Sequence, residues 1–155
     1  MNTSPIFPLE GVVVTPLRQI VDARGKIMHM LRRDASVFTE FGEIYFSEAN
    51  HGAVKGWNRH RRMGLNYAVP RGRILLVLFD QRSGSSTAGR TQEIVLGDGN
   101  YNLVTIPPMI WTGFQGLSAE PALVANCATL PHDPDEVERR APDDPSIPYR
   151  WTAAS

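Results

Sequence analysis

Two polar residues that stand two positions apart, Asn58 and His60, have the types and the spacing to do chemistry. Alternate residues of a β-strand point to the same face of the sheet, so we expect both side chains on one face. The imidazole of His60 is suited to take up and release a proton near neutral pH, whereas the amide of Asn58 has no useful basicity. His60 is therefore the candidate general base, with Asn58 near enough to hydrogen-bond to it. The alternative is that His60 lines a binding site without catalysing a reaction.

Four other side chains, close to these two in the sequence or further away, are candidates for contacts with a substrate or for proton transfer. Lys55 and the more distant Arg24 would suit a diphosphate, because lysine supplies a point charge and arginine a planar fork; ordinary surface salt bridges are the alternative. The flat ring of Trp111 could stack on a base or a sugar. Tyr67 could donate a proton, although tyrosines are more often core residues whose hydroxyl finds a partner.

The segments that must position these residues have the sequence pattern of short strands. Twelve prolines and thirteen glycines separate brief apolar runs, as is typical of all-β chains. The expected strands are 12–16, 26–31, 43–49, 53–57, 65–69, 73–80, 91–96, 101–106, 112–116 and 122–128. Both alternating sets of residues in 73–80 are apolar, so this strand should be buried on both faces. Only residues 34–41 hint at a helix, and many short strands predict a sandwich or barrel.

The chain is expected to form a single domain over residues 1–155, which is long enough for one hydrophobic core. The barrel should span about residues 10–129. From Leu130 onward the composition shifts to Pro, Asp, Glu and Arg. This tail, about residues 130–155, is expected to wrap the barrel surface.

Composition limits the partners. Sixteen basic and sixteen acidic side chains cancel, so no net field favours nucleic acid or an anionic membrane. The single Cys127 rules out an internal disulfide and fits a reducing compartment. No apolar run approaches the ~18 residues of a membrane span, and residues 1–9 lack the pattern of a secretory leader. A cytoplasmic location is expected.

Six short blocks resemble, in order, the dTDP-4-dehydrorhamnose 3,5-epimerase family of cupins. They lie at 22–25, 46–51, 54–58, 80–89, 106–114 and 144–151. The segment between Gly56 and Gly72 also resembles the His-x-His motif of sugar-nucleotide ketoisomerases of the same fold. The resemblance implies an all-β, RmlC-like cupin jelly-roll barrel with an irregular C-terminal tail. It also implies a homodimer in which one subunit donates an N-terminal strand to the other, and the apolar run 12–14 could serve that role.

The resemblance further implies which residues form the site. The substrate-binding set that it suggests, together with the residue types, is Arg24, Glu48, Asn50, Lys55, Asn58 and Trp111. The family's catalytic His corresponds to Asn58, its acid Tyr lies near Ala125, and its orienting acid has no counterpart before the chain ends. His60 and Tyr67 are therefore the predicted catalytic replacements.

No metal or other cofactor is expected. A cupin metal site usually draws its ligands from a His-x-His motif and from a later histidine, but Asn58 and Thr112 occupy two of those positions. One remaining imidazole cannot supply the three or four ligands that such metals take.

The predicted function is that of an isomerase or epimerase without a metal. Its substrate would be a nucleotide-linked 4-keto-6-deoxy sugar, with dTDP as the expected nucleotide, and the reaction would move a proton beside the keto group. The alternative is a non-catalytic cupin that binds a sugar nucleotide or another carbohydrate, which would explain the replaced residues without new chemistry.

Overall fold

A computed structural model describes residues 8–154 of the chain. Residues 1–7 and residue 155 lie outside this range. Most of the segment 1–9, for which no secretory leader was predicted, is therefore outside the described residues. The strands are β1 (Val13–Pro16), β2 (Gln19–Asp22), β3 (Gly25–Met28), β4 (Glu43–Ala49), β5 (Val54–His60), β6 (Leu65–Arg71), β7 (Arg73–Asp80), β8 (Thr91–Gly97), β9 (Asn102–Ile106), β10 (Ile110–Gly116), β11 (Ala122–Ala128) and β12 (Val137–Arg139), with one 3₁₀ turn, η1 (Pro134–Glu136).

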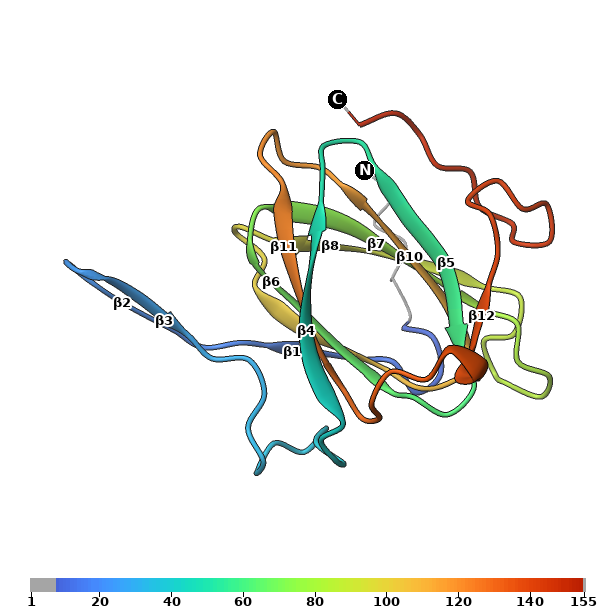
Figure 1. Ribbon diagram of the computed structural model, residues 1–155, viewed down its shortest axis with the longest axis horizontal. Coiled ribbons are helices and arrows are strands. Elements are labelled where there is room, and N and C mark those ends of the chain that lie inside the picture. Colours follow the sequence, from blue (N-terminus) through green and yellow to red (C-terminus); the bar gives the residue numbers. More distant parts are fainter. Residues whose placement is uncertain (1–7, 155) are drawn as a thin grey trace.

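Ten of these strands form two facing antiparallel sheets (Figure 1). The first sheet has the order β1-β9-β6-β11-β4, and the second has the order β12-β5-β10-β7-β8. From β4 to β12, consecutive strands alternate between the two sheets except β7 and β8, which pair in the second sheet, and this is the arrangement of a jelly roll. The predicted all-β, cupin-type barrel is therefore confirmed.

The core lies between the two sheets and is made of the inward-facing apolar residues. Strand β7 illustrates the reason for the fold: Ile74, Leu76 and Leu78 point into the barrel and are fully buried. On the other side of the same strand, Val77 and Phe79 are also buried, under the C-terminal tail. As predicted, this strand is covered on both faces.

The C-terminal tail does more than wrap the surface. Its first part folds back as β12, which pairs with the end of β5 and so extends the second sheet. The rest of the tail packs aromatic rings against the outside of that sheet, where Trp151 lies 5.2 Å from Trp57 between ring centroids. This covers the outer face of β5 and fixes the position of the strand that carries Asn58 and His60.

The prediction of a helix at 34–41 was wrong, because the segment forms only turns. Strands β2 and β12 were not predicted from the sequence. These two strands are four and three residues long, too short to show an alternating pattern. Residues 8–154 contain no helix that is long and apolar enough to cross a membrane.

Strands β2 and β3 form a hairpin that projects from the barrel as an arm (Figure 1). The residues of this arm are almost all exposed, including Val21 at 71% and Ile27 at 60%. Strand β4, at the edge of the first sheet, also exposes Ile44 and Phe46. Exposed apolar residues on an extended element commonly mark a contact with another chain.

Candidate functional site

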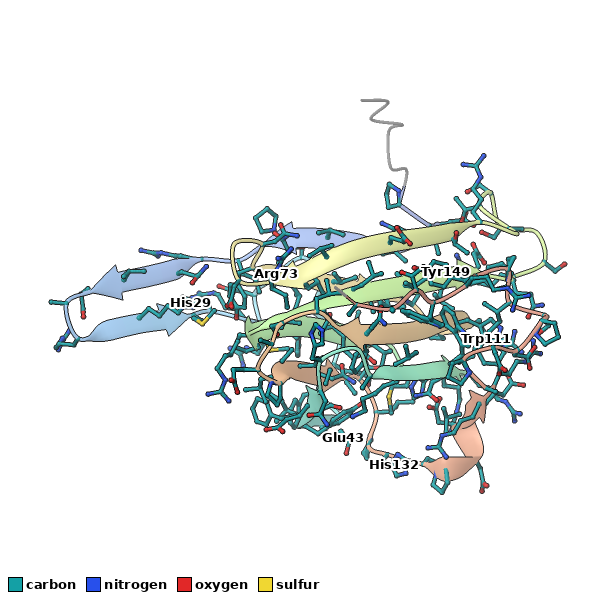
Figure 2. All side chains as sticks on the ribbon, turned by 90° about the horizontal axis from the view of Figure 1, so that it is seen from above. His29, Glu43, Arg73, Trp111, His132 and Tyr149 are labelled. Carbon is teal, nitrogen blue, oxygen red and sulfur yellow. The ribbon has the colours of Figure 1, made fainter. Side chains whose placement is uncertain are left out.

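Two adjoining cavities open between the sheets, and Tyr45 and Asn58 line both of them. The first has a volume of about 320 Å³ and the second about 390 Å³. The first cavity is lined by Tyr45, Ser47, Lys55, Gly56, Asn58, Tyr67, Thr112, Phe114, Val124 and Asn126. The second is lined by Glu43, Tyr45, Asn58, His60, Met63, His132, Val137 and Arg139. Glu43 and His132 mark the side of the barrel on which the second cavity lies (Figure 2).

Asn58 and His60 share a face of β5 and line these cavities, as the strand period predicts. Lys55 joins them, although simple alternation would place it on the opposite face. The reason is an irregularity in the pairing of β5 with β10: Asn58 stands opposite Thr112, but Lys55 stands opposite Phe114. Two residues of β5 thus face one of β10, and such a bulge re-aims a side chain.

The imidazole of His60 forms a hydrogen-bonded pair with the carboxylate of Glu136 through Nδ1. The side chain of His60 is 14% exposed and that of Glu136 is 2% exposed. A carboxylate that accepts a hydrogen bond from Nδ1–H fixes the ring tautomer and leaves Nε2 free to accept a proton. The pair therefore has the arrangement of an oriented general base.

Glu136 is itself held in place by the backbone. Its second oxygen accepts hydrogen bonds from the N–H groups of Arg62 and Met63, both at 3.1 Å. Burial alone would raise the pKa of Glu136, but the hydrogen bonds from His60 and from these two N–H groups outweigh it and lower the pKa below its usual value. The carboxylate is therefore charged at neutral pH and faces the imidazole in a fixed position.

Glu136 was not predicted as a site residue from the sequence, and no orienting acid was assigned to the site. The residue ends η1, whose first residue is Pro134. Asp133 caps this turn, because its side chain accepts a hydrogen bond from the N–H of Asp135. This Asp-Pro start is a signal for a helical turn that the sequence does contain. It does not reveal that the turn would lie beside His60, because that depends on the pairing of β12 with β5.

The predicted proton donor Tyr67 lines the first cavity from β6. Its ring is buried and packs edge-on against Phe114, with 6.1 Å between ring centroids. Burial, with a smaller contribution from Tyr45, raises the pKa of Tyr67 far above its ordinary value. This environment keeps the proton on the hydroxyl.

A second tyrosine, Tyr45 on β4, was not singled out from the sequence. Its hydroxyl accepts a hydrogen bond of 3.0 Å from the side-chain amide of Asn126. The two residues are directly paired between β4 and β11. An aromatic in a strand is usually read as a core residue, so nothing in the sequence marked Tyr45 as a site residue.

The predicted substrate-binding residues are only partly brought together. Lys55 lines the first cavity and donates hydrogen bonds to Ser47 Oγ and, at 3.2 Å, to the carbonyl oxygen of Glu48. The side chains of Glu48 and Asn50 line neither cavity. The cause for Glu48 is strand alternation, since Tyr45 and Ser47 take the inward positions of β4.

Trp111 and Arg24 lie away from the cavities. Trp111 points to the outer face of the second sheet, where Arg59 and Arg140 stack on its ring at 4.7 and 4.6 Å from the ring centre; its neighbour Thr112 takes the inward position. Arg24 lies in the turn of the β2–β3 arm, with a side chain 90% exposed, and pairs with Asp22. Neither side chain reaches the cavities of its own chain.

Over residues 8–154, no three His, Cys, Asp or Glu side chains gather in a way that could hold a metal ion. His132 lines the second cavity, whereas His51 hydrogen-bonds to the backbone at Ser118. The ionisable and amide groups that line the two cavities are the oriented imidazole of His60 and that of His132, two tyrosine hydroxyls, two side-chain amides, the cations Lys55 and Arg139, and the carboxyl group of Glu43.

Comparison with known proteins identifies the family of the chain. The sequence profile of the dTDP-4-dehydrorhamnose 3,5-epimerase family matches residues 7–155. The chain belongs to that family, and the predicted assignment to the sugar-nucleotide epimerases and isomerases is confirmed.

Three relatives give the scale of the similarity. The probable low-salt glycan biosynthesis epimerase Agl13 of Haloferax volcanii is 35% identical, over 91% of this chain and 88% of its own. The spore coat polysaccharide biosynthesis protein SpsL of Bacillus subtilis is 30% identical, over 92% of this chain and 96% of its own. The crystal structure of a dTDP sugar isomerase from Desulfovibrio desulfuricans G20 is 47% identical, covers 95% of this chain and 94% of that one, and has a TM-score of 0.92.

Proposed function

We propose that the protein epimerises a dTDP-linked 4-keto-6-deoxy sugar and that His60, oriented by Glu136, is the base. The observation that carries this proposal is the buried pair of His60 Nδ1 with Glu136 at the wall of the second cavity. A hydrogen atom on a carbon beside a keto group is acidic enough for such a base to remove. Family membership and the name of the Desulfovibrio structure support a dTDP-linked sugar.

The reaction would proceed through an enolate. His60 Nε2 takes the proton from the carbon, the electron pair of that C–H bond forms a double bond to the keto carbon, and the keto oxygen becomes negative. Asn58 lines both cavities, and its side-chain amide can donate a hydrogen bond to that oxygen. Return of a proton to the opposite face of the carbon inverts its configuration and completes the epimerisation.

The diphosphate would bind at the Lys55 end of the first cavity. Lys55 is an exposed cation there, next to the hydroxyl of Ser47, and a lysine beside a hydroxyl group suits phosphate oxygens. The sugar would then extend from Lys55 past Asn58 toward His60, along residues that line the two adjoining cavities.

The protein would act as a homodimer. The β2–β3 arm exposes apolar residues and makes no cavity contact in its own chain, and the edge strand β4 exposes Ile44 and Phe46. Packing the arm of one subunit against the edge of the other would cover both surfaces. It would also carry Arg24, the predicted phosphate ligand, toward the site of the partner subunit.

Solvent exchange tests this function. In D₂O, dTDP-4-keto-6-deoxyglucose incubated with the protein should gain deuterium at a carbon beside the keto group, as followed by NMR. A sugar-nucleotide-binding protein without catalysis would bind the compound and exchange no carbon-bound hydrogen. UDP-4-keto-6-deoxyglucose, tested in parallel, would show whether the thymidine base is required.

A further inference from the structure

The hydroxyl of Tyr45 occupies a central position in the site. Tyr45 lines both cavities, and among the residues of the described chain it shares that place only with Asn58. It projects from β4 of the first sheet, whereas His60 projects from β5 of the second, facing sheet. A sugar ring held between the sheets would therefore have the imidazole and this hydroxyl on opposite sides.

The direction of the hydrogen bond at Tyr45 is fixed by the neighbouring backbone. The N–H of Asn66 donates to the side-chain oxygen of Asn126 at 3.1 Å. A backbone N–H can only donate, so the amide of Asn126 must present its NH₂ group to Tyr45 Oη. The hydroxyl of Tyr45 accepts this hydrogen bond, and its own proton remains free to point into the cavity.

Tyr45 is also more accessible than Tyr67 to a molecule bound in the cavities. Tyr45 is 40% exposed, whereas Tyr67 is 7% exposed. The amide of Asn126 donates to Tyr45 Oη and holds the hydroxyl in place at the cavity wall. For Tyr67, burial raises the pKa, and no amide donor reaches its hydroxyl among the hydrogen bonds of residues 8–154.

We propose that Tyr45 is the proton donor that completes the epimerisation, and that Asn126 is the residue that positions it. This inference rests on the proposed function. After His60 has taken a proton from one face of the carbon, Tyr45 gives its hydroxyl proton to the other face, and the electron pair of the enolate forms the new C–H bond. The enzyme is left with a protonated His60 and a Tyr45 phenolate, and exchange with solvent water returns both groups to their first state.

The variant Tyr45→Phe separates proton removal from inversion. His60 should still remove the proton and return a deuteron to the same face, so dTDP-4-keto-6-deoxyglucose in D₂O should still exchange. Formation of the inverted sugar should fall by about 10²–10⁴-fold, the usual cost of losing an acid–base group. Tyr149→Phe, on the outer face of the second sheet, is the matched control and should exchange and invert like the wild type.

The variant Asn126→Asp provides a second test if Tyr45→Phe does not fold. It keeps the shape of the side chain and its acceptor for the N–H of Asn66, but it makes Tyr45 donate its proton to the new carboxylate. Exchange should again persist while inversion falls.

Three results would overturn the inference. Inversion at the wild-type rate in Tyr45→Phe or Asn126→Asp would show that the hydroxyl is not needed. Loss of exchange together with inversion in Tyr45→Phe would assign Tyr45 to substrate binding or to structure. Loss of inversion in Tyr67→Phe, with inversion retained in Tyr45→Phe, would make Tyr67 the donor. A wild-type protein that shows no exchange at all would instead contradict the proposed function.

Discussion

His60 and Glu136 are 76 residues apart in the sequence, and their side chains meet at the wall of the site. At the residue scale, this pair shows that the site still contains a base although Asn58 occupies the position of the family's catalytic histidine. The amide of Asn58 cannot act as a base, but a base two residues further along the same strand faces the same space. An imidazole needs a fixed tautomer and orientation to be effective, and Glu136 supplies both.

The variant Glu136→Gln tests this role of Glu136. The glutamine oxygen can still accept hydrogen bonds from the backbone of Arg62 and Met63, so its NH₂ group would face His60. It would then donate to Nδ1 and leave the proton on Nε2, where the imidazole cannot act as a base. The kcat for solvent exchange should fall by at least about 10²-fold, whereas the KM for the dTDP sugar should change little. A rise in KM with an unchanged kcat would contradict the orienting role.

At the scale of elements, most strands were predicted from the sequence, as was His60, one of the two members of the His60–Glu136 pair. Apolar periodicity predicted β4, β7 and β11 with their observed bounds, because alternation over seven or eight residues is a strong signal. The same periodicity placed Asn58 and His60 on one face.

Two features of the site depend on pairing between distant segments and could not be predicted. The bulge between β5 and β10 places Lys55 beside Asn58, and strict alternation would have separated them. The return of β12 to β5 brings Glu136 to His60. Neither register is encoded in the local sequence, since both depend on which strand the segment meets in the folded protein.

The turn after β7 contains a buried carboxylate whose role is structural. Asp80 is fully buried and accepts hydrogen bonds from Arg82, Ser85 and Thr87. Burial alone would raise the pKa of Asp80, but these hydrogen bonds outweigh it and hold the pKa well below 3.8. The ionised carboxylate therefore stabilises the fold at pH values above about 4, and this contribution is lost as the pH falls toward the lowered pKa.

The variant Asp80→Asn should consequently lower the free energy of unfolding at pH 7 by about 3 kcal/mol or more, as expected when a buried ion pair loses one partner. Urea denaturation at several pH values measures this. The deficit relative to the wild type should shrink below about pH 4, because the wild-type carboxylate then begins to lose its advantage. Asp34→Asn, which removes an exposed pair with Arg32, is the control and should leave the midpoint nearly unchanged. An Asp80→Asn deficit that stays constant with pH would contradict this explanation.

At the scale of the whole molecule, the barrel and its arm have different surfaces. The barrel buries its apolar residues between two sheets, whereas the arm exposes Ile20, Val21 and Ile27 to solvent. An isolated two-stranded hairpin is only marginally stable, so packing against another surface would stabilise the arm. The exposed edge at β4 offers such a surface on a second copy of the chain.

Light scattering should therefore give about twice the mass of the 17.2 kDa chain. Val21→Asp should shift the protein toward the monomer, because the substitution puts a charge into the apolar contact of the arm. Ala88→Asp adds the same charge to an exposed loop far from the arm in the sequence and should leave the mass unchanged. A wild-type protein of about 17 kDa at micromolar concentration would rule out the dimer.

The measurement that tests the central claim most directly is solvent exchange by the His60→Asn variant. Wild-type and variant proteins would be incubated with dTDP-4-keto-6-deoxyglucose in D₂O, and binding of dTDP would be measured in parallel by calorimetry. If His60 is the base, deuterium incorporation should fall by about 10²–10⁴-fold, while dTDP binding, which should depend on Lys55 and the cavity walls, stays nearly intact. Exchange at the wild-type rate in His60→Asn would contradict the assignment of His60 and Glu136 as the oriented base of this enzyme.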